Sequence, residues 1–123
     1  MLHIAIAEDE RSERSQLEAQ IRQFIEEHGL RAEIHGFELA QPLLDSYASG
    51  EHYDIILLDI QMPGIDGMTA AASIRNVDPD VLIIFITSMA QYAVQGYKVN
   101  AFDFLVKPVT QEALTACCGR CVC

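Results

Sequence analysis

Short, nearly continuous apolar runs alternate along the chain with stretches in which apolar residues recur every three or four positions. Such runs are typical of strands buried on both faces, and the longer spacing is typical of amphipathic helices. The pattern predicts five strands, at residues 2–7, 31–37, 53–58, 81–86 and 101–106. It predicts five helices, at residues 11–28, 39–48, 67–76 and 90–98 and from residue 111 onward.

Turn and cap residues stand where one predicted element gives way to the next. Gly29 follows the first helical stretch, Asp66 is placed to cap the third helix, and Thr110 is placed to cap the fifth. Asp78 and Pro79 end the third helix, because the residue before a proline disfavours helical geometry. Each predicted helix, with the turns at its two ends, forms a connection long enough for a right-handed crossover between parallel strands.

This order of elements predicts one α/β domain over residues 1–123. Strands that alternate with helices form a parallel sheet covered on both faces. We expect the flavodoxin-like, doubly wound fold, with five strands in the order 2-1-3-4-5 and five helices. A chain of 123 residues that is 50% hydrophobic is long enough for one such core.

The charge of the chain narrows the classes of partner. Its formal net charge is −10, and it has no basic stripe with which to bind nucleic acid or an anionic membrane. Its apolar runs are far shorter than the roughly 20 residues of a membrane helix, and its N-terminus turns acidic where a secretory signal stays apolar. We expect a cytoplasmic protein that binds neither membrane nor nucleic acid directly and whose negative charge favours the binding of metal cations.

Three carboxylates follow the first and third predicted strands. Glu8 and Asp9 come after the first strand, and Asp59 comes after the third. With the strand order 2-1-3-4-5 these strands are neighbours at the point where ligands bind in such sheets, so the acids converge. Three close carboxylates repel one another unless a cation lies between them, and Mg²⁺ prefers such hard oxygen ligands.

The next two strands bring a hydroxyl and a cation to the same edge of the sheet. Thr87 follows the fourth strand and Lys107 follows the fifth. Both suit a phosphoryl group, because the hydroxyl donates a directed hydrogen bond and the ammonium neutralises charge. We interpret Asp59 as a nucleophile that forms an aspartyl phosphate, with Mg²⁺ and Lys107 stabilising the transferring group.

These residues, in this order, resemble the receiver domain of bacterial two-component response regulators. The matching positions are Glu8-Asp9, "LLDIQMPGIDG" around Asp59, Thr87 and Lys107-Pro108. The segment at residues 88–109 is further similar to the LytTR-type subgroup, whose receivers precede a DNA-binding domain. The resemblance implies a switch that catalyses only its own phosphorylation and dephosphorylation, with a sensor histidine kinase as the phosphoryl donor.

The resemblance also implies roles for individual residues. Asp9 would bind Mg²⁺ directly, Glu8 would bind it through water, and Asp59 and the backbone carbonyl of Gln61 would complete the ligands. The bond before Pro108 would be cis. Thr87 and Phe104 match the switch pair of the family, in which the hydroxyl moves toward the phosphoryl group and the ring swings inward behind it.

The expected output is a change in the face formed by the fourth helix, the fifth strand and the fifth helix. The resemblance implies that this face controls a transcriptional output domain, with self-association into a homodimer as the hypothesis for how it is read. The sequence ends after the predicted fifth helix, so we expect DNA contacts to come from a C-terminal domain absent from this chain, and excision from a longer regulator is favoured over a stand-alone receiver.

Three other functions fit parts of the pattern. A phosphohydrolase of the haloacid dehalogenase type also uses an aspartate nucleophile, but its second aspartate falls where Gln61 stands. A flavodoxin-like cofactor carrier needs a phosphate-binding loop where this chain has Glu8-Asp9-Glu10, which would repel a phosphate. A degenerate receiver that takes no phosphate is the third alternative.

The histidines and cysteines complete the inventory of candidate ligands. The histidines show no metal-ligand spacing, and no function is assigned to them: His3, His28, His35 and His52. The cysteines gather at the end of the chain, where we interpret them as free thiols of a helix, with half a zinc site or a redox pair as the alternative: Cys117, Cys118, Cys121 and Cys123.

Overall fold

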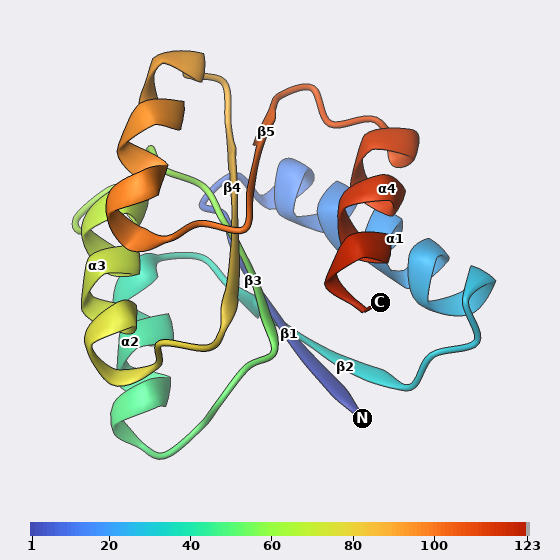
Figure 1. Ribbon diagram of the computed structural model, residues 1–123, viewed down its shortest axis with the longest axis horizontal. Helices are drawn as coiled ribbons and strands as arrows, with labels where there is room; N and C mark the ends of the chain where they lie inside the picture. Colours follow the sequence, from blue (N-terminus) through green and yellow to red (C-terminus); the bar gives the residue numbers. More distant parts are fainter. Residues whose placement is uncertain (123) are drawn as a thin grey trace.

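The computed structural model of the protein, which describes residues 1–122, contains a central sheet of five parallel strands (Figure 1). The strands lie in the order β2-β1-β3-β4-β5, as the sequence predicts. Their bounds are β1 Leu2–Ala7, β2 Ala32–Phe37, β3 Ile55–Leu58, β4 Leu82–Thr87 and β5 Asp103–Val106. The flavodoxin-like fold is therefore confirmed.

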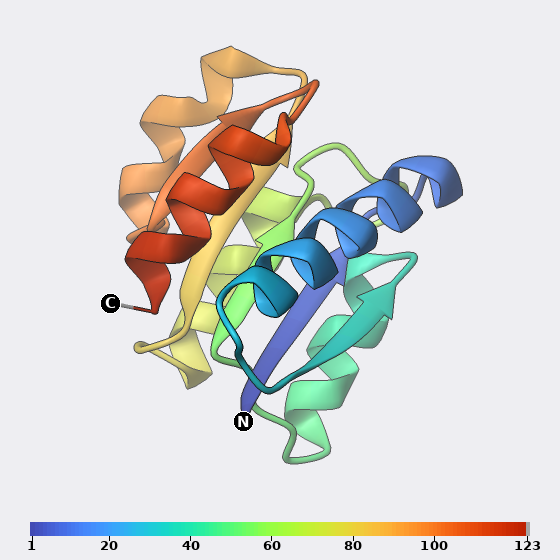
Figure 2. The same ribbon diagram turned by 90° about the vertical axis from the view of Figure 1, so that its right-hand side faces the viewer.

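Five helices cover the two faces of the sheet. Figure 1 shows α2, α3 and η1 on one face and α1 and α4 on the other, and Figure 2 shows α1 and α4 lying side by side. Their bounds are α1 Arg11–Glu27, α2 Ala40–Ala48, α3 Gly67–Val77, η1 Ala90–Val99 and α4 Gln111–Cys121. Among the helices of residues 1–122, none has the length and apolarity of a membrane span.

The sheet separates two hydrophobic clusters because both faces of its central strands are buried. On the face of α2, α3 and η1, Ile56, Leu58 and Phe85 pack with helix residues such as Leu43 and Ile74. The opposite cluster is formed by strand residues and by α1 and α4, and includes Ile4, Ile6, Leu17, Ile21, Phe24, Ile84 and Leu114. The continuous apolar runs of the sequence serve both clusters at once.

Two helix caps are confirmed. The Asp66 carboxylate accepts a hydrogen bond from the backbone N–H of Thr69 at 2.8 Å, at the start of α3. The Thr110 hydroxyl accepts one from the N–H of Ala113 at 3.1 Å, at the start of α4. Each cap satisfies a backbone donor that the first turn of a helix leaves unpaired.

The segment from β4 to β5 differs most from the sequence prediction. The expected fourth α-helix is a 3₁₀ helix, and its residues include Val94, Gly96 and Val99, which are weak helix formers. The Arg75 guanidinium of α3 fixes its end by donating to the carbonyl of Val99 at 2.7 Å. Strand β5 begins at Asp103 rather than residue 101, because the chain first turns through a left-handed residue, Asn100.

Candidate functional site

The carboxyl ends of β1 and β3 bring three acidic side chains together. Ala7 and Leu58 are paired in register, and the backbone N–H of Asp59 donates to the carbonyl of Ala7 at 3.0 Å. Glu8 and Asp59 are buried and Asp9 is half-buried. One oxygen from each of these three acids lies within 4.8 Å of the others. The predicted convergence of the acids is therefore present.

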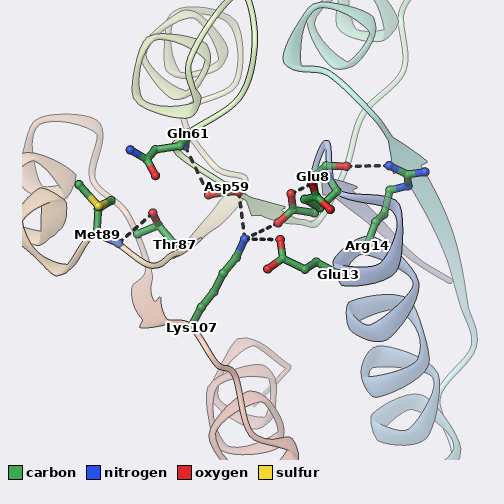
Figure 3. A network of polar contacts seen from close by, with 9 residues as sticks. Glu8, Glu13, Arg14, Asp59, Gln61, Thr87, Met89 and Lys107 are labelled. Atoms are coloured by element: carbon green, nitrogen blue, oxygen red, sulfur yellow. Dashed lines mark hydrogen bonds and ion pairs between the residues drawn. The ribbon is translucent and has the colours of Figure 1, made fainter.

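Lys107 reaches this acidic group from the end of β5. Its backbone N–H donates to the carbonyl of Thr87 at 2.8 Å, and the Lys107-Pro108 peptide bond is cis, as the family resemblance implies. The ammonium Nζ donates to Glu8 Oε1 at 2.5 Å and to Asp59 Oδ2 at 3.1 Å (Figure 3). One cation thus bridges the acids of two neighbouring strands.

Glu13 and Arg14 of α1 also belong to this network, and the sequence analysis missed both. Glu13 Oε2 accepts a hydrogen bond from Lys107 Nζ at 3.0 Å, and the Arg14 guanidinium donates to the backbone carbonyl of Glu8 at 2.8 Å (Figure 3). An acid in the first turn of a helix is expected for the helix dipole alone, so Glu13 gave no separate signal in the sequence.

The pKa values of both Glu8 and Lys107 are raised in this network, for different physical reasons. Desolvation raises the pKa of Glu8 to about 7, against the opposing effect of its hydrogen bond from Lys107. Desolvation also disfavours the charged form of Lys107, but its hydrogen bonds with Glu8, Glu13 and Asp59 outweigh this and hold its pKa above the usual value. Lys107 therefore stays protonated, whereas Glu8 binds a proton unusually readily.

Thr87 and Phe104 lie on neighbouring strands at different depths. The Thr87 side chain is buried, and its hydroxyl accepts a hydrogen bond from the backbone N–H of Met89 at 3.2 Å (Figure 3). Phe104 is half-buried beside Phe85, with ring centroids 6.3 Å apart. It lines a pocket of about 390 Å³ between η1 and β5, whereas the acids face a different cleft.

The cleft over the acids has a volume of about 490 Å³ and a strongly polar lining. Gln61 and Ser88 line it beside the charged residues, and the backbone N–H of Gln61 points to Asp59 Oδ1 at 3.4 Å. Its oxygen donors, Glu8, Asp9 and Asp59, form the hard ligand set that Mg²⁺ prefers. Such a cleft accommodates a small charged group next to the Asp59 carboxylate.

The raised pKa of Glu8 predicts an unusual pH dependence of stability when divalent cations are chelated. Between pH 4.5, the ordinary pKa of this group, and about 7, the folded state binds the proton more tightly than the unfolded chain. The free energy of unfolding should therefore fall as the pH rises through this window, by roughly 1–3 kcal/mol from this group. Urea denaturation at several pH values measures this.

The control for this experiment is a second acid that contacts the same ammonium. Glu8→Gln should flatten the decline between these pH values, because the titrating group is gone. Glu13→Gln should keep the decline, since Glu13 also contacts Lys107 but lies half-exposed at the surface. Equal slopes for the wild type and Glu8→Gln would contradict the assignment to Glu8.

Comparison with known proteins identifies the family of this arrangement. Residues 4–118 match the family model of the response regulator receiver domain. The chain belongs to this family. Receiver domains are signalling switches of two-component systems, and the recognition made from Glu8-Asp9, Asp59, Thr87 and Lys107 is confirmed.

Two curated relatives support the finer assignment of this receiver domain. It is 37% identical to the sensory transduction protein LytT of Oceanobacillus iheyensis, over 97% of this chain and 47% of LytT. It is 34% identical to the positive alginate biosynthesis regulatory protein of Pseudomonas aeruginosa, over 92% of this chain and 44% of that protein. These similarities confirm the LytTR-type subgroup, and the chain spans about half the length of these relatives.

Solved structures of other receivers share the fold closely. The response regulator TrrA of Thermotoga maritima, solved in complex with Mg²⁺-BeF, superposes with a TM-score of 0.84 and 27% identity, covering 98% of this chain and 99% of TrrA. The response regulatory domain of mrkE from Klebsiella pneumoniae superposes with a TM-score of 0.86 and 25% identity. The match covers 98% of this chain and 95% of the mrkE domain. The receiver fold therefore extends over nearly the whole chain.

Proposed function

We propose that the chain is a cytoplasmic, phosphorylation-dependent switch that accepts a phosphoryl group on Asp59 from a sensor histidine kinase. The observation that carries the proposal is the position of the Asp59 carboxylate, which is largely buried, lines the polar cleft and lies 3.1 Å from the Lys107 ammonium. A carboxylate in this position is a nucleophile with a cation beside the group that it attacks.

The transfer forms one bond and breaks another. A carboxylate oxygen of Asp59 attacks phosphorus, the phosphorus–nitrogen bond of the kinase phosphohistidine breaks, and the electron pair returns to the imidazole. Lys107 neutralises a phosphoryl oxygen as charge spreads over the transferring group. The Thr87 hydroxyl, at the carboxyl end of β4, donates a hydrogen bond to another oxygen after exchanging its contact with Met89.

The acids of the cleft would hold Mg²⁺, and TrrA provides an example of a receiver with Mg²⁺-BeF bound. Glu8, Asp9 and Asp59 would supply carboxylate ligands, with Glu8 acting through water, and Gln61 would supply its backbone carbonyl. When bound, the ion would neutralise charge on the transferring phosphoryl group. The 2.5 Å hydrogen bond from Lys107 to Glu8 would then weaken, and the Lys107 ammonium would be free to move toward the phosphoryl oxygens.

The switch would run from Thr87 to Phe104 and then to the surface. As the Thr87 hydroxyl moves toward the phosphoryl group it vacates space behind it, and the half-buried Phe104 ring turns inward, away from the pocket between η1 and β5. The population then shifts toward a state with a different η1-β5-α4 face. Exposed apolar residues already lie on this face, namely Val94, Tyr97 and Val106.

We infer that this face is read by self-association and controls a DNA-binding domain of the LytTR type. The relatives that contain a matching region are about twice as long as this chain, which leaves room for an output domain in such proteins. Sedimentation velocity with and without the phosphoryl mimic Mg²⁺-BeF should show a shift from monomer to dimer. An unchanged monomer in both samples would contradict the homodimer.

The proposed phosphoryl transfer is tested by intact mass after incubation with an acyl phosphate donor. The wild type should gain one phosphoryl group with Mg²⁺ present and should gain none when Mg²⁺ is chelated. Borohydride reduction followed by peptide mapping should place the modification at Asp59. No addition under any condition would point instead to a degenerate receiver that acts through protein contacts.

A further inference from the structure

A second group of metal-ligating side chains lies on the same face of β1 and β2, toward the amino ends of these strands. His3 of β1 is paired in register with Glu33 of β2, and His35 follows two residues later on β2. Since side chains alternate between faces, these three project from one face of the sheet. His3 precedes Glu8 by five residues, a distance of roughly 16 Å along an extended strand, so this group is separate from the acidic cleft.

The distances within this group match those between ligands of one metal ion. Glu33 Oε2 lies 3.4 Å from His3 Nδ1 and 3.6 Å from His35 Nε2. Ligands at about 2.0–2.1 Å from a tetrahedral zinc ion are roughly 3.3 Å apart. One ligand atom from each residue lies within 4.8 Å of the other two. Small side-chain rotations would therefore bring all three atoms around one ion.

The His35 ring is held in place with one nitrogen unsatisfied. His35 Nε2 is inaccessible to water, and within residues 1–122 it has no hydrogen-bond partner. The ring packs edge-on against the Tyr53 ring, with centroids 5.5 Å apart, and stacks on the His3 ring, with centroids 5.9 Å apart. Burying a polar nitrogen without a partner is unfavourable, and a bound cation would satisfy it.

Backbone contacts hold the partners of His35 in position. The backbone N–H of His3 donates to Asp54 Oδ2 at 2.8 Å, which fixes the start of β1 beside β3. Glu33 is fixed by the parallel pairing of β1 with β2. The three ligands thus stand on two paired strands, and such rigid elements orient metal ligands better than loops do.

We propose that His3, Glu33 and His35 form a binding site for a divalent transition-metal ion of the Zn²⁺ class. Two imidazoles and one carboxylate suit Zn²⁺, whereas Mg²⁺ prefers the oxygen ligands of the acidic cleft. Three protein ligands would leave one of the four positions of a tetrahedral ion for a water molecule or another ligand. The ion joins the edge strand β2 to β1, so it stabilises the folded state of this edge of the sheet.

The test is titration of the full chain with Zn²⁺ by isothermal calorimetry, with excess Mg²⁺ to occupy the acidic cleft. The wild type should bind one equivalent at the proposed site. His3→Gln, Glu33→Gln and His35→Gln should each weaken binding by roughly tenfold or more. His52→Gln is the matched control and should keep wild-type affinity, because His52 is exposed and lies outside the group.

Two further measurements keep the outcome clear. Co²⁺ bound at this site should show no thiolate-to-metal charge-transfer band, whereas binding by the cysteines of α4 would produce one. Far-UV circular dichroism should confirm that the His3→Gln variant is folded, since His3 lies at the surface. If the His35→Gln variant fails to fold, the binding result for His3→Gln is the one that tests the proposal. Absence of Zn²⁺ binding, or binding that His3→Gln leaves unchanged, would overturn the proposal and leave an ordinary ion pair.

Discussion

Asp59→Asn is expected to abolish phosphoryl addition completely. The side-chain amide has the shape of the carboxylate, but its nitrogen and carbonyl oxygen are poor nucleophiles toward phosphorus. Asp59 also supplies one of the three converging carboxylates of the cleft and accepts the 3.1 Å hydrogen bond from Lys107. Nucleophile and cation ligand are therefore lost together. Intact mass after incubation with an acyl phosphate donor and Mg²⁺ measures the result.

Asp66→Asn provides a matched control in the same loop. It is the same chemical change, made on an aspartate that caps α3 through the N–H of Thr69. Asparagine caps helices as well as aspartate does, so this variant should fold normally and take up the phosphoryl group as the wild type does. Full phosphoryl addition to Asp59→Asn would contradict the proposal, because the phosphoryl group would then be carried by another side chain.

Gly67→Ala is expected to cause the largest loss of stability of any conservative change in this loop. Gly67 is the first residue of α3, and its N–H donates to the carbonyl of Ile60 at 2.8 Å. An added Cβ would overlap the backbone carbonyl oxygen of Asp59 and would lie 2.8 Å from the Ile60 Cα. These are backbone atoms, so no side-chain rotation relieves the clash.

The loop would have to move away from α3, and the free energy of unfolding should fall by roughly 3 kcal/mol or more. Because the clash is with the Asp59 backbone itself, the same change should also misplace the carboxylate of this proposed phosphoryl acceptor. Urea denaturation measures the first effect and the rate of phosphoryl addition measures the second. A loss below about 1 kcal/mol would show that the loop yields easily, contrary to the packing described above.

Gly119→Ala is the control for this substitution. Gly119 lies inside α4, and an added Cβ there would meet no atom within 4 Å among the described residues. Alanine is the better helix former, so this variant should gain roughly 0.5–1 kcal/mol. Opposite signs for the same change at two helical glycines would separate the packing effect from helix propensity.

The order of the sheet and the convergence of the acids were predictable because both depend on short-range patterns. Buried parallel strands read as continuous apolar runs, and a polar residue directly after such a run must lie at the carboxyl edge of the sheet. Glu8, Asp59 and Lys107 follow their strands immediately, so their placement needed only the strand order. The 3₁₀ geometry of η1 was missed, because its weak helix formers give no clear period.

The sequence by itself determined the class of the fold and the acidic edge of the sheet, and it suggested the proposed phosphoryl-transfer chemistry, because each depends on residue types at the ends of strands. Only the tertiary structure decided which distant side chains meet. It brought Glu13 of α1 to Lys107, and it placed His3 beside His35 through the register of β1 and β2. Contacts of this kind depend on the register of paired strands and on the rotation of each helix about its axis. The sequence spacing between residues on different elements predicts neither of these.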